Sequence, residues 1–243
     1  MKPWYHSWFN SPYYHLLYKE RDSKEAEFFL DNLIDKLALG KGSNIVDIAC
    51  GKGRHSVYLN KKGFNVTGID LSNESIKYCK QFENETLEFF EHDMRTAFRI
   101  KYFEVAINLF TSFGYFEKQH DNLLSIRSAA ASLKKDGIFV LDYFNSHKVL
   151  MTLPSAFSKN LGNIDFVFEK KAVDGKVIKS IKVNDSGREF LFEESVWLYT
   201  KEDFEKMLDE CGLKLKFTYG DYSLNDFNQE KSDRLILVSQ KVK

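Results

Sequence analysis

The chain has 243 residues, 43% of them hydrophobic and 29% charged, which is an ordinary composition for a soluble globular protein. The 35 lysine and arginine residues are balanced by 35 aspartate and glutamate residues, so no net positive charge favours nucleic acid as a partner. No apolar run approaches the roughly 18 residues that a membrane-spanning helix needs, so we expect no membrane partner either.

The first residues, MKPWYHSWFNSPYYH, are aromatic and polar, which is not the pattern of a signal peptide. The three cysteines, Cys50, Cys79 and Cys211, are odd in number, widely spaced and without a CxxC pair. Cysteines in this pattern indicate a reducing compartment and no zinc site, so we expect a cytoplasmic protein.

Residues 1–22 hold a high density of large apolar and aromatic side chains. They are Trp4, Tyr5, Trp8, Phe9, Tyr13, Tyr14, Leu16, Leu17 and Tyr18. Because so many aromatic side chains need a surface to cover, we expect a docked segment and not a free tail. The apolar residues of 24–39 recur at helical spacing, and Gly40 ends that predicted helix.

From residue 44 onward, short apolar strands alternate with helices. The predicted strands cover residues 45–48, 64–69, 87–93, 103–110 and 137–144. The predicted helices between them cover residues 54–62, 73–82 and 119–134. This alternation is typical of a parallel sheet with helices on both faces.

The pattern changes after the fifth strand. Strand-like segments joined by Asp-Gly and Ser-Gly turn signals cover residues 163–173, 176–185 and 188–200. They predict an antiparallel β-meander inserted at 160–199. A helix and two strands are then predicted at 201–211, 213–220 and 233–240. We therefore predict one α/β domain, 1–243, with a Rossmann-like, doubly wound, seven-stranded and mostly parallel sheet whose last strand is antiparallel.

The stretch NIVDIACGKGRHSVYLNKKGFNVTGID, residues 44–70, places a glycine loop between a strand and a helix. Such a loop brings bare backbone against a ligand, and the helix that follows offers its amide groups. Asp70 ends the next strand, 17 residues after Gly53, where a carboxylate can accept hydrogen bonds from both ribose hydroxyls. A nicotinamide cofactor, a phosphate and an adenosyl sulfonium compound all fit this outline.

Two details weaken the nicotinamide interpretation. Asp47 precedes the loop, and a carboxylate there would repel a pyrophosphate but suits a cationic, aminoacyl-bearing ligand. The dinucleotide fingerprint also requires GxGxxG or GxGxxA, whereas this chain has Gly51, Gly53 and then Ser56.

VDIACGKG followed by VTGIDLS resembles the first two motifs of the class I S-adenosylmethionine-dependent methyltransferases. EHDM after the third strand and NLFTSFGYF at the fourth match the later motifs in order, and the likeness spans about residues 10 to 242. One departure is Ala49, which stands where the family usually has the first glycine of the loop. The resemblance implies S-adenosylmethionine as the cofactor and S-adenosylhomocysteine as its product.

The resemblance also implies roles for individual residues. The methionine part and the sulfonium would be lined by Asp47, Ala49, Cys50, Gly51 and Gly53, and approached by Asn108 and Leu109. Asp70 would hold the ribose hydroxyls and Leu71 would lie against the adenine. Asp93 would accept a hydrogen bond from the adenine amino group, and Met94 would pack on the ring. His55 either contacts the cofactor or only begins the helix.

The N-terminal stretch SPYYHLLYKERD resembles the lid of small-molecule methyltransferases, in particular sugar N-methyltransferases and glycine N-methyltransferase-like enzymes. Tyr14 and Tyr18, four residues apart on one helical face, would close over the cofactor. The inserted meander also resembles the sugar N-methyltransferases, where such a meander helps form either the acceptor pocket or the dimer contact. The resemblance therefore leaves open a homodimer through the meander. Phe113, Tyr115 and Tyr143 are the residues expected to line the acceptor pocket.

Methyl transfer from a sulfonium is a direct displacement that mainly needs alignment and exclusion of water, so no sequence motif identifies a catalytic residue. The chain lacks the Asp/Asn-Pro-Pro-aromatic motif of DNA amino-methyltransferases and the adjacent Asp-Asn pair of a catechol-type magnesium site. We therefore expect metal-free transfer to a small-molecule amine or hydroxyl acceptor. The alternatives are an NAD(P)-dependent oxidoreductase and a non-catalytic S-adenosylmethionine-binding protein.

Overall fold

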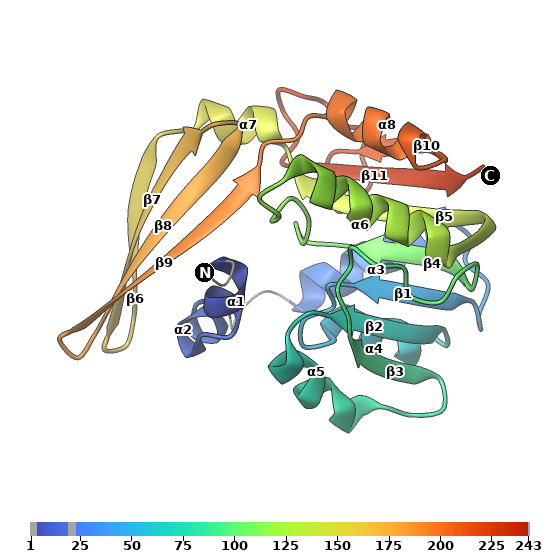
Figure 1. Ribbon diagram of the computed structural model, residues 1–243, viewed down its shortest axis with the longest axis horizontal. Coiled ribbons are helices and arrows are strands. Elements are labelled where there is room, and N and C mark those ends of the chain that lie inside the picture. Colours follow the sequence, from blue (N-terminus) through green and yellow to red (C-terminus); the bar gives the residue numbers. More distant parts are fainter. Residues whose placement is uncertain (1–3, 19–22, 243) are drawn as a thin grey trace.

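The computed structural model describes residues 4–18 and 23–242, which form a larger and a smaller β-sheet (Figure 1). The larger sheet has the strand order β10-β11-β5-β4-β1-β2-β3. Its strands are β1 (Asn44–Ile48), β2 (Asn65–Asp70), β3 (Leu87–Glu91), β4 (Phe103–Asn108), β5 (Leu133–Phe144), β10 (Leu213–Tyr219) and β11 (Arg234–Lys241). β1 to β5 pair in parallel, whereas β11 runs antiparallel to both β5 and β10. The predicted seven-stranded sheet with an antiparallel last strand is confirmed.

Helices cover both faces of this sheet because its strands are apolar on both sides. The helices are α3 (Ser23–Lys36), α4 (Arg54–Lys61), α5 (Asn73–Cys79), α6 (Gln119–Ser132), α7 (Ser146–Met151) and α8 (Lys201–Glu210), with a short 3-10 helix at Lys80–Phe82. Along β4, Val105 and Ile107 pack with α3, α4 and α5, while Phe103 and Ala106 pack with α6 and α8. The sheet is therefore doubly wound, with its carboxyl edge open between the two layers.

The smaller sheet is an antiparallel meander. It consists of β6 (Ser155–Leu161), β7 (Ile164–Val173), β8 (Lys176–Asp185) and β9 (Arg188–Trp197), paired in that order. The predicted segments correspond to β7, β8 and β9, but β6 and α7 were not predicted. β6 reads SAFSKNL and is exposed along most of its length, so it carries no alternating apolar signal.

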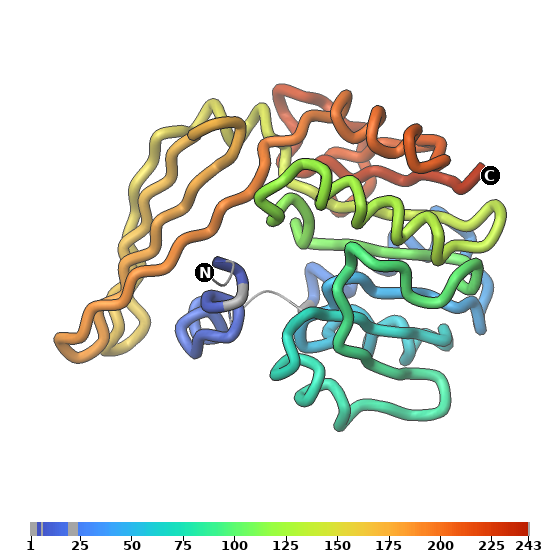
Figure 2. Tube along the Cα trace, viewed as in Figure 1, coloured from blue at the N-terminus to red at the C-terminus, as the bar shows by residue number. Residues whose placement is uncertain are grey.

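The N-terminal helices α1 (Trp4–Phe9) and α2 (Pro12–Leu17) pack on the meander and not on the larger sheet. Trp8 and Leu17 are buried against Phe166, Phe168 and the neighbouring aliphatic side chains of β8. Figure 2 shows this segment lying between the meander and the rest of the chain. Of the expected lid segment, residues 1–3 and 19–22 lie outside the described residues.

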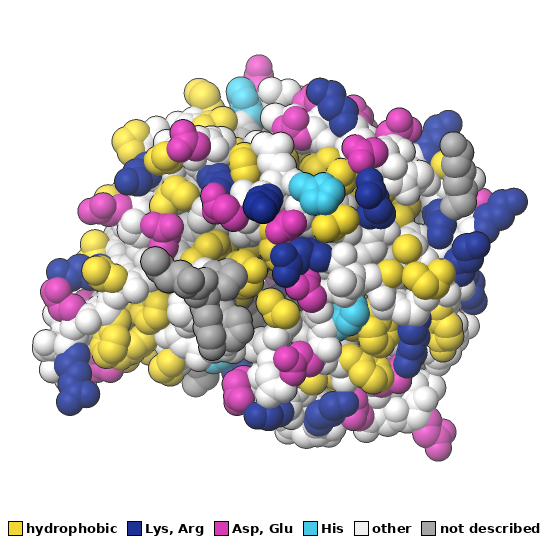
Figure 3. Space-filling model, viewed as in Figure 1, with side chains coloured by type: hydrophobic (Ala, Val, Ile, Leu, Met, Phe, Trp, Pro, Cys, Tyr) yellow, Lys and Arg dark blue, Asp and Glu magenta, His cyan; other side chains and the backbone are white. Residues whose placement is uncertain are grey.

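On the face drawn in Figure 3, lysine and arginine side chains are interspersed with aspartate and glutamate side chains. This mixture matches the zero formal net charge of the chain. Within the described ranges, no helix is long and apolar enough to cross a membrane.

Candidate active site

A cavity of about 650 Å³ lies at the carboxyl ends of β1, β2 and β4, and we call it the first cavity. The glycine loop after β1 forms one wall, and α2 with Tyr18 forms another. Its lining includes Tyr14, His15, Tyr18, Ala49, Cys50, Gly51, Gly53, His55, Asp70, Ser72, Leu109, Phe110 and Tyr115. The structure thus brings most of the predicted cofactor-binding residues together around one space.

Two glycines in the loop are required for different reasons. Gly51 has a φ of 55°, and a Cβ built on it meets no atom within 4 Å, so its bare side faces open space. Gly53 has a φ of 75°, and a Cβ there would lie 2.8 Å from the ring of Phe89. Gly53 therefore serves packing of the helix against the sheet, whereas Gly51 leaves room for a ligand.

Asp70 joins the loop to the end of β2. Its carboxylate accepts a hydrogen bond from the amide of Gly51 at 2.8 Å and one from the amide of Ser72 at 2.7 Å. Burial raises the pKa of Asp70 above its ordinary value. An ionised carboxylate has about four acceptor positions, so Asp70 can order the loop and still accept bonds from a ligand.

Asp47 and Asn108 lie beneath the loop and are fully buried. Ser56 donates a hydrogen bond to Asp47 at 2.6 Å, and burial raises the pKa of Asp47 to about 7. Asn108 donates through its Nδ2 to the carbonyl of Ile48, at 3.2 Å, but its Oδ1 has no hydrogen-bond partner among the described residues. Buried oxygen atoms are normally hydrogen-bonded, so Asn108 Oδ1 is suited to accept a hydrogen bond from a bound ligand.

A small cavity of about 80 Å³ adjoins the first one and shares Asp70 and Ala49 with it. We call it the third cavity, because a larger second cavity is described below. Leu71, Asp93 and Met94, the residues that the family resemblance assigns to the adenine, also line it.

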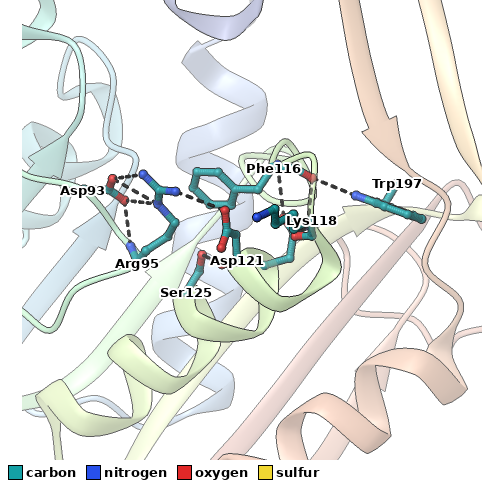
Figure 4. Close-up of polar contacts among 8 residues, drawn as sticks. Asp93, Arg95, Phe116, Lys118, Asp121, Ser125 and Trp197 are labelled. Carbon is teal, nitrogen blue, oxygen red and sulfur yellow. Dashed lines mark hydrogen bonds and ion pairs between the residues drawn. The ribbon is translucent and has the colours of Figure 1, made fainter. Parts of the chain in front are cut away.

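Arg95, which the sequence analysis did not single out, fixes Asp93 (Figure 4). The guanidinium lies 2.6 Å from Asp93 Oδ2 and 3.2 Å from Asp121, and it stacks 4.7 Å from the centre of the Phe116 ring. Burial raises the pKa of Asp93, but the hydrogen bonds from Arg95 lower it further, so this pKa lies below its ordinary value. The carbonyl of Phe116 accepts a hydrogen bond from Trp197 Nε1 at 2.8 Å. The loop between β4 and α6, which carries Phe116, is thus joined to β9.

A second cavity, of about 420 Å³, is enclosed by the N-terminal helices, the meander and the larger sheet with its loops. It shares Phe9, Tyr14, Phe110 and Tyr115 with the first cavity. Its other walls come from all parts of the fold: Trp4, Glu25, Thr111, Phe144, Val149, Lys170, Val177, Lys179, Glu194, Val196 and Arg234.

Arg234 and Asp142 hold the loop that separates these two cavities. Arg234 Nε donates to Asp142 at 2.8 Å, and Asp142 accepts a second bond from the amide of Phe110 at 2.7 Å. Phe110 and Thr111 have φ values of 56° and 59°, which non-glycine residues rarely adopt. A buried ion pair therefore stabilises a strained turn at the junction of the cavities.

Two predicted acceptor residues lie elsewhere. Phe113 and Tyr143 are 1% and 0% exposed and pack in the core with α6 and α8, and neither lines any of the three cavities. Their chain neighbours Ser112 and Phe144 face the cavities instead. Tyr143 and Phe144 differ because successive residues of a strand point to opposite faces, whereas Phe113 and Ser112 lie in the loop after β4. Tyr115, the third predicted residue, lines all three cavities.

The profile of the methyltransferase domain family matches residues 20–216. This chain belongs to that family. The methyltransferase YqeM of Bacillus subtilis (strain 168) is 29% identical over 217 residues, which cover 85% of this chain and 87% of the relative. Glycine/sarcosine N-methyltransferase of Aphanothece halophytica is 28% identical over 241 residues, covering 91% of this chain and 83% of the relative.

The fold of this methyltransferase is also that of solved family members. The crystal structure of an S-adenosylmethionine-dependent methyltransferase from Clostridium acetobutylicum ATCC 824 superposes with a TM-score of 0.78 at 21% identity, over 94% of this chain and 95% of the other. The protein is thus an S-adenosylmethionine-dependent methyltransferase, which confirms the predicted family and cofactor and sets the nicotinamide alternative aside.

Proposed function

We propose that this methyltransferase methylates a small-molecule amine held in the second cavity, with a hydroxyl compound as the second candidate. The observation that carries the proposal is the shared wall of Phe9, Tyr14, Phe110 and Tyr115, where the cavity at the glycine loop meets a separate cavity beneath the meander. A ligand in each cavity would approach the other at these four shared residues.

The first and third cavities suit S-adenosylmethionine. Asp70 would accept from the ribose hydroxyls, and Leu71, Asp93 and Met94 would surround the adenine. The open side of Gly51 gives the methionine part room. When bound, S-adenosylmethionine supplies an electrophilic methyl group on a positively charged sulfur.

Asn108 adds a polar feature that fits the same ligand. Its unpartnered Oδ1 is an acceptor buried beside the loop, and the ammonium group of the methionine part is a donor of matching polarity. Asp47 is buried beneath the loop, and burial raises its pKa to about 7, so a cationic ligand end beside it would favour its ionised, negative form. Together they favour a cationic ligand end over a pyrophosphate.

The walls around the junction favour an amine as the acceptor. Trp4, Phe9, Tyr14 and Tyr115 form a run of ring contacts with centroids 4.9 to 5.6 Å apart. Aromatic faces stabilise positive charge, and in methyl transfer to an amine the positive charge moves from sulfur to nitrogen. The residues would then align the amine and exclude water in a direct displacement without a metal ion. The name of the relative from Aphanothece halophytica, an N-methyltransferase, supports the same choice.

A screen of amines, amino acids, amino sugars and hydroxyl compounds, with release of S-adenosylhomocysteine as the readout, tests this function. We expect turnover with one class of amine and a methylated nitrogen in the product. Turnover confined to hydroxyl compounds would establish the second candidate. Tight S-adenosylhomocysteine binding without turnover on the whole panel would favour a binding protein instead.

We propose, further, that α1 and α2 form a lid over the cofactor. Tyr14 and Tyr18 line the first cavity, but the segment that carries them rests on the meander, away from the main sheet. A short segment that belongs to neither layer of the larger sheet should open more readily than the core. We predict that amide exchange in residues 8–18 is fast without ligand and slows when S-adenosylhomocysteine is added, as hydrogen-exchange mass spectrometry would show. Equally slow exchange in both states would make the segment a fixed cap.

We propose a homodimer through the outer edge of β6. That edge pairs with no strand among the described residues, and unpaired edges are templates for a second chain. Ser158→Pro would disturb this edge because proline interferes with strand pairing. We expect light scattering to give a dimer mass for the natural chain and a monomer mass for the variant. A monomeric natural chain would contradict the proposal.

A further inference from the structure

A polar cluster joins the meander to the N-terminal helices inside otherwise apolar packing. Glu194 of β9 accepts hydrogen bonds through Oε1 from Trp8 Nε1 at 2.7 Å and from the Tyr18 hydroxyl at 3.1 Å. Lys179 of β8 donates to Glu194 Oε2 at 3.2 Å and to the Tyr18 hydroxyl at 2.7 Å. The Tyr18 hydroxyl is therefore held from two sides.

The cluster is largely shielded from water. The side chains of Lys179 and Glu194 are 14% and 19% exposed, and Trp8 is fully buried. Lys179 lies directly opposite Glu194 in the β8–β9 pairing, and its ammonium group also lies 5.0 Å from the centre of the Phe168 ring. An ion pair in such surroundings adds little net stability over apolar side chains of similar size, so its value lies in what it orients.

What it orients is a wall residue of the cofactor cavity. Tyr18 lines the first cavity, whereas Lys179 and Glu194 line the second. The pair therefore connects the two cavities through one tyrosine. We propose that Glu194 and Lys179 are positioning residues that hold Tyr18 against the bound cofactor. This inference rests on the proposed assignment of the first cavity to S-adenosylmethionine.

The same meander contains a matched pair with no such connection. Lys182 and Glu189 approach to 2.6 Å across β8 and β9, but their side chains are 48% and 58% exposed and line none of the three cavities. Glu189→Ala therefore removes a carboxylate from the same strand, and a neighbouring ion pair, without touching Tyr18.

Calorimetric titration with S-adenosylhomocysteine tests the proposal. We expect Glu194→Ala and Tyr18→Phe each to weaken binding about tenfold, and Glu189→Ala to stay within about twofold of the natural chain. If Glu194 acts through Tyr18, adding Glu194→Ala to Tyr18→Phe should weaken binding by no more than about a further twofold. Lys179→Met should also weaken binding, and Lys179→Arg should restore most of it.

The outcomes distinguish the positioning role of Glu194 from the assignment of the first cavity to the cofactor. Independent, multiplying losses in the double variant would mean that Glu194 only supports the fold, which overturns the positioning role. Unchanged affinity in Glu194→Ala, or in Glu194→Leu should the alanine variant not fold, would overturn it as well. Unchanged affinity in Asp70→Ala would instead contradict the assignment of the first cavity to the cofactor.

Discussion

Asp70→Ala is expected to weaken the binding of S-adenosylhomocysteine by about 10- to 150-fold, which corresponds to about 1.5–3 kcal/mol. The substitution removes two things at once. The ribose hydroxyls lose their acceptor, and the Gly51 amide loses the carboxylate that it contacts at 2.8 Å. The loop that lines the ligand therefore loses an ordering contact in the same step. Calorimetry on the purified variant measures the effect.

Glu91 provides the matched control. It ends β3 in register with Asp70, and it lines none of the three cavities. We expect Glu91→Ala to bind S-adenosylhomocysteine within about twofold of the natural chain. If Asp70→Ala also stayed within that range, Asp70 would not hold the ribose.

The glycine loop and Asp70 could be predicted because they belong to one strand–loop–helix–strand unit. The spacing of such a unit is local, so a short stretch of sequence shows that Gly51 and Asp70 meet. The three charged residues that organise the rest of the site lack this advantage. Arg95 acts on Phe116 and Asp121, Glu194 on Trp8 and Tyr18, and Arg234 on Asp142.

Each of these contacts joins residues that are far apart in the chain or lie in an irregular loop. Arg234 and Asp142 are 92 residues apart, and Glu194 and Trp8 are 186 apart. A lone charge in a strand looks like an ordinary exposed residue when its partner is so distant. Pairing in three dimensions, and not the residue type, makes such a charge part of the site.

The acceptor residues illustrate a second limit. The sequence located the correct strand end and loop. It predicted that Tyr143 and Phe113 line the acceptor cavity, but both are buried, and their neighbours Phe144 and Ser112 line the cavities. The last part of β5, IFVLDYF, is apolar at every position except Asp142, so it has no alternation from which to read its two faces. Phe113 lies in the loop after β4, where no strand period applies. β6 shows the opposite case, because a strand exposed on most residues has too few apolar positions to reveal its period.

Gly51→Val is expected to abolish detectable binding of S-adenosylhomocysteine while the protein remains folded. A Cβ on Gly51 meets no protein atom within 4 Å, so the added side chain enters the space assigned to the ligand. The cost to the fold is mainly that of holding a non-glycine residue at a φ of 55°, about 1–3 kcal/mol. Calorimetry and circular dichroism measure the two effects separately.

Gly42→Val separates strain from obstruction. Gly42 has a φ of 78°, its Cβ would also meet nothing within 4 Å, and it lines none of the three cavities. Both valine variants should therefore lose a similar amount of thermal stability, but only Gly51→Val should lose the ligand. Gly53→Ala should destabilise the fold itself, since its Cβ would lie 2.8 Å from the Phe89 ring. Wild-type affinity in a folded Gly51→Val protein would place the cofactor elsewhere, because a ligand against that backbone cannot share its position with a valine side chain.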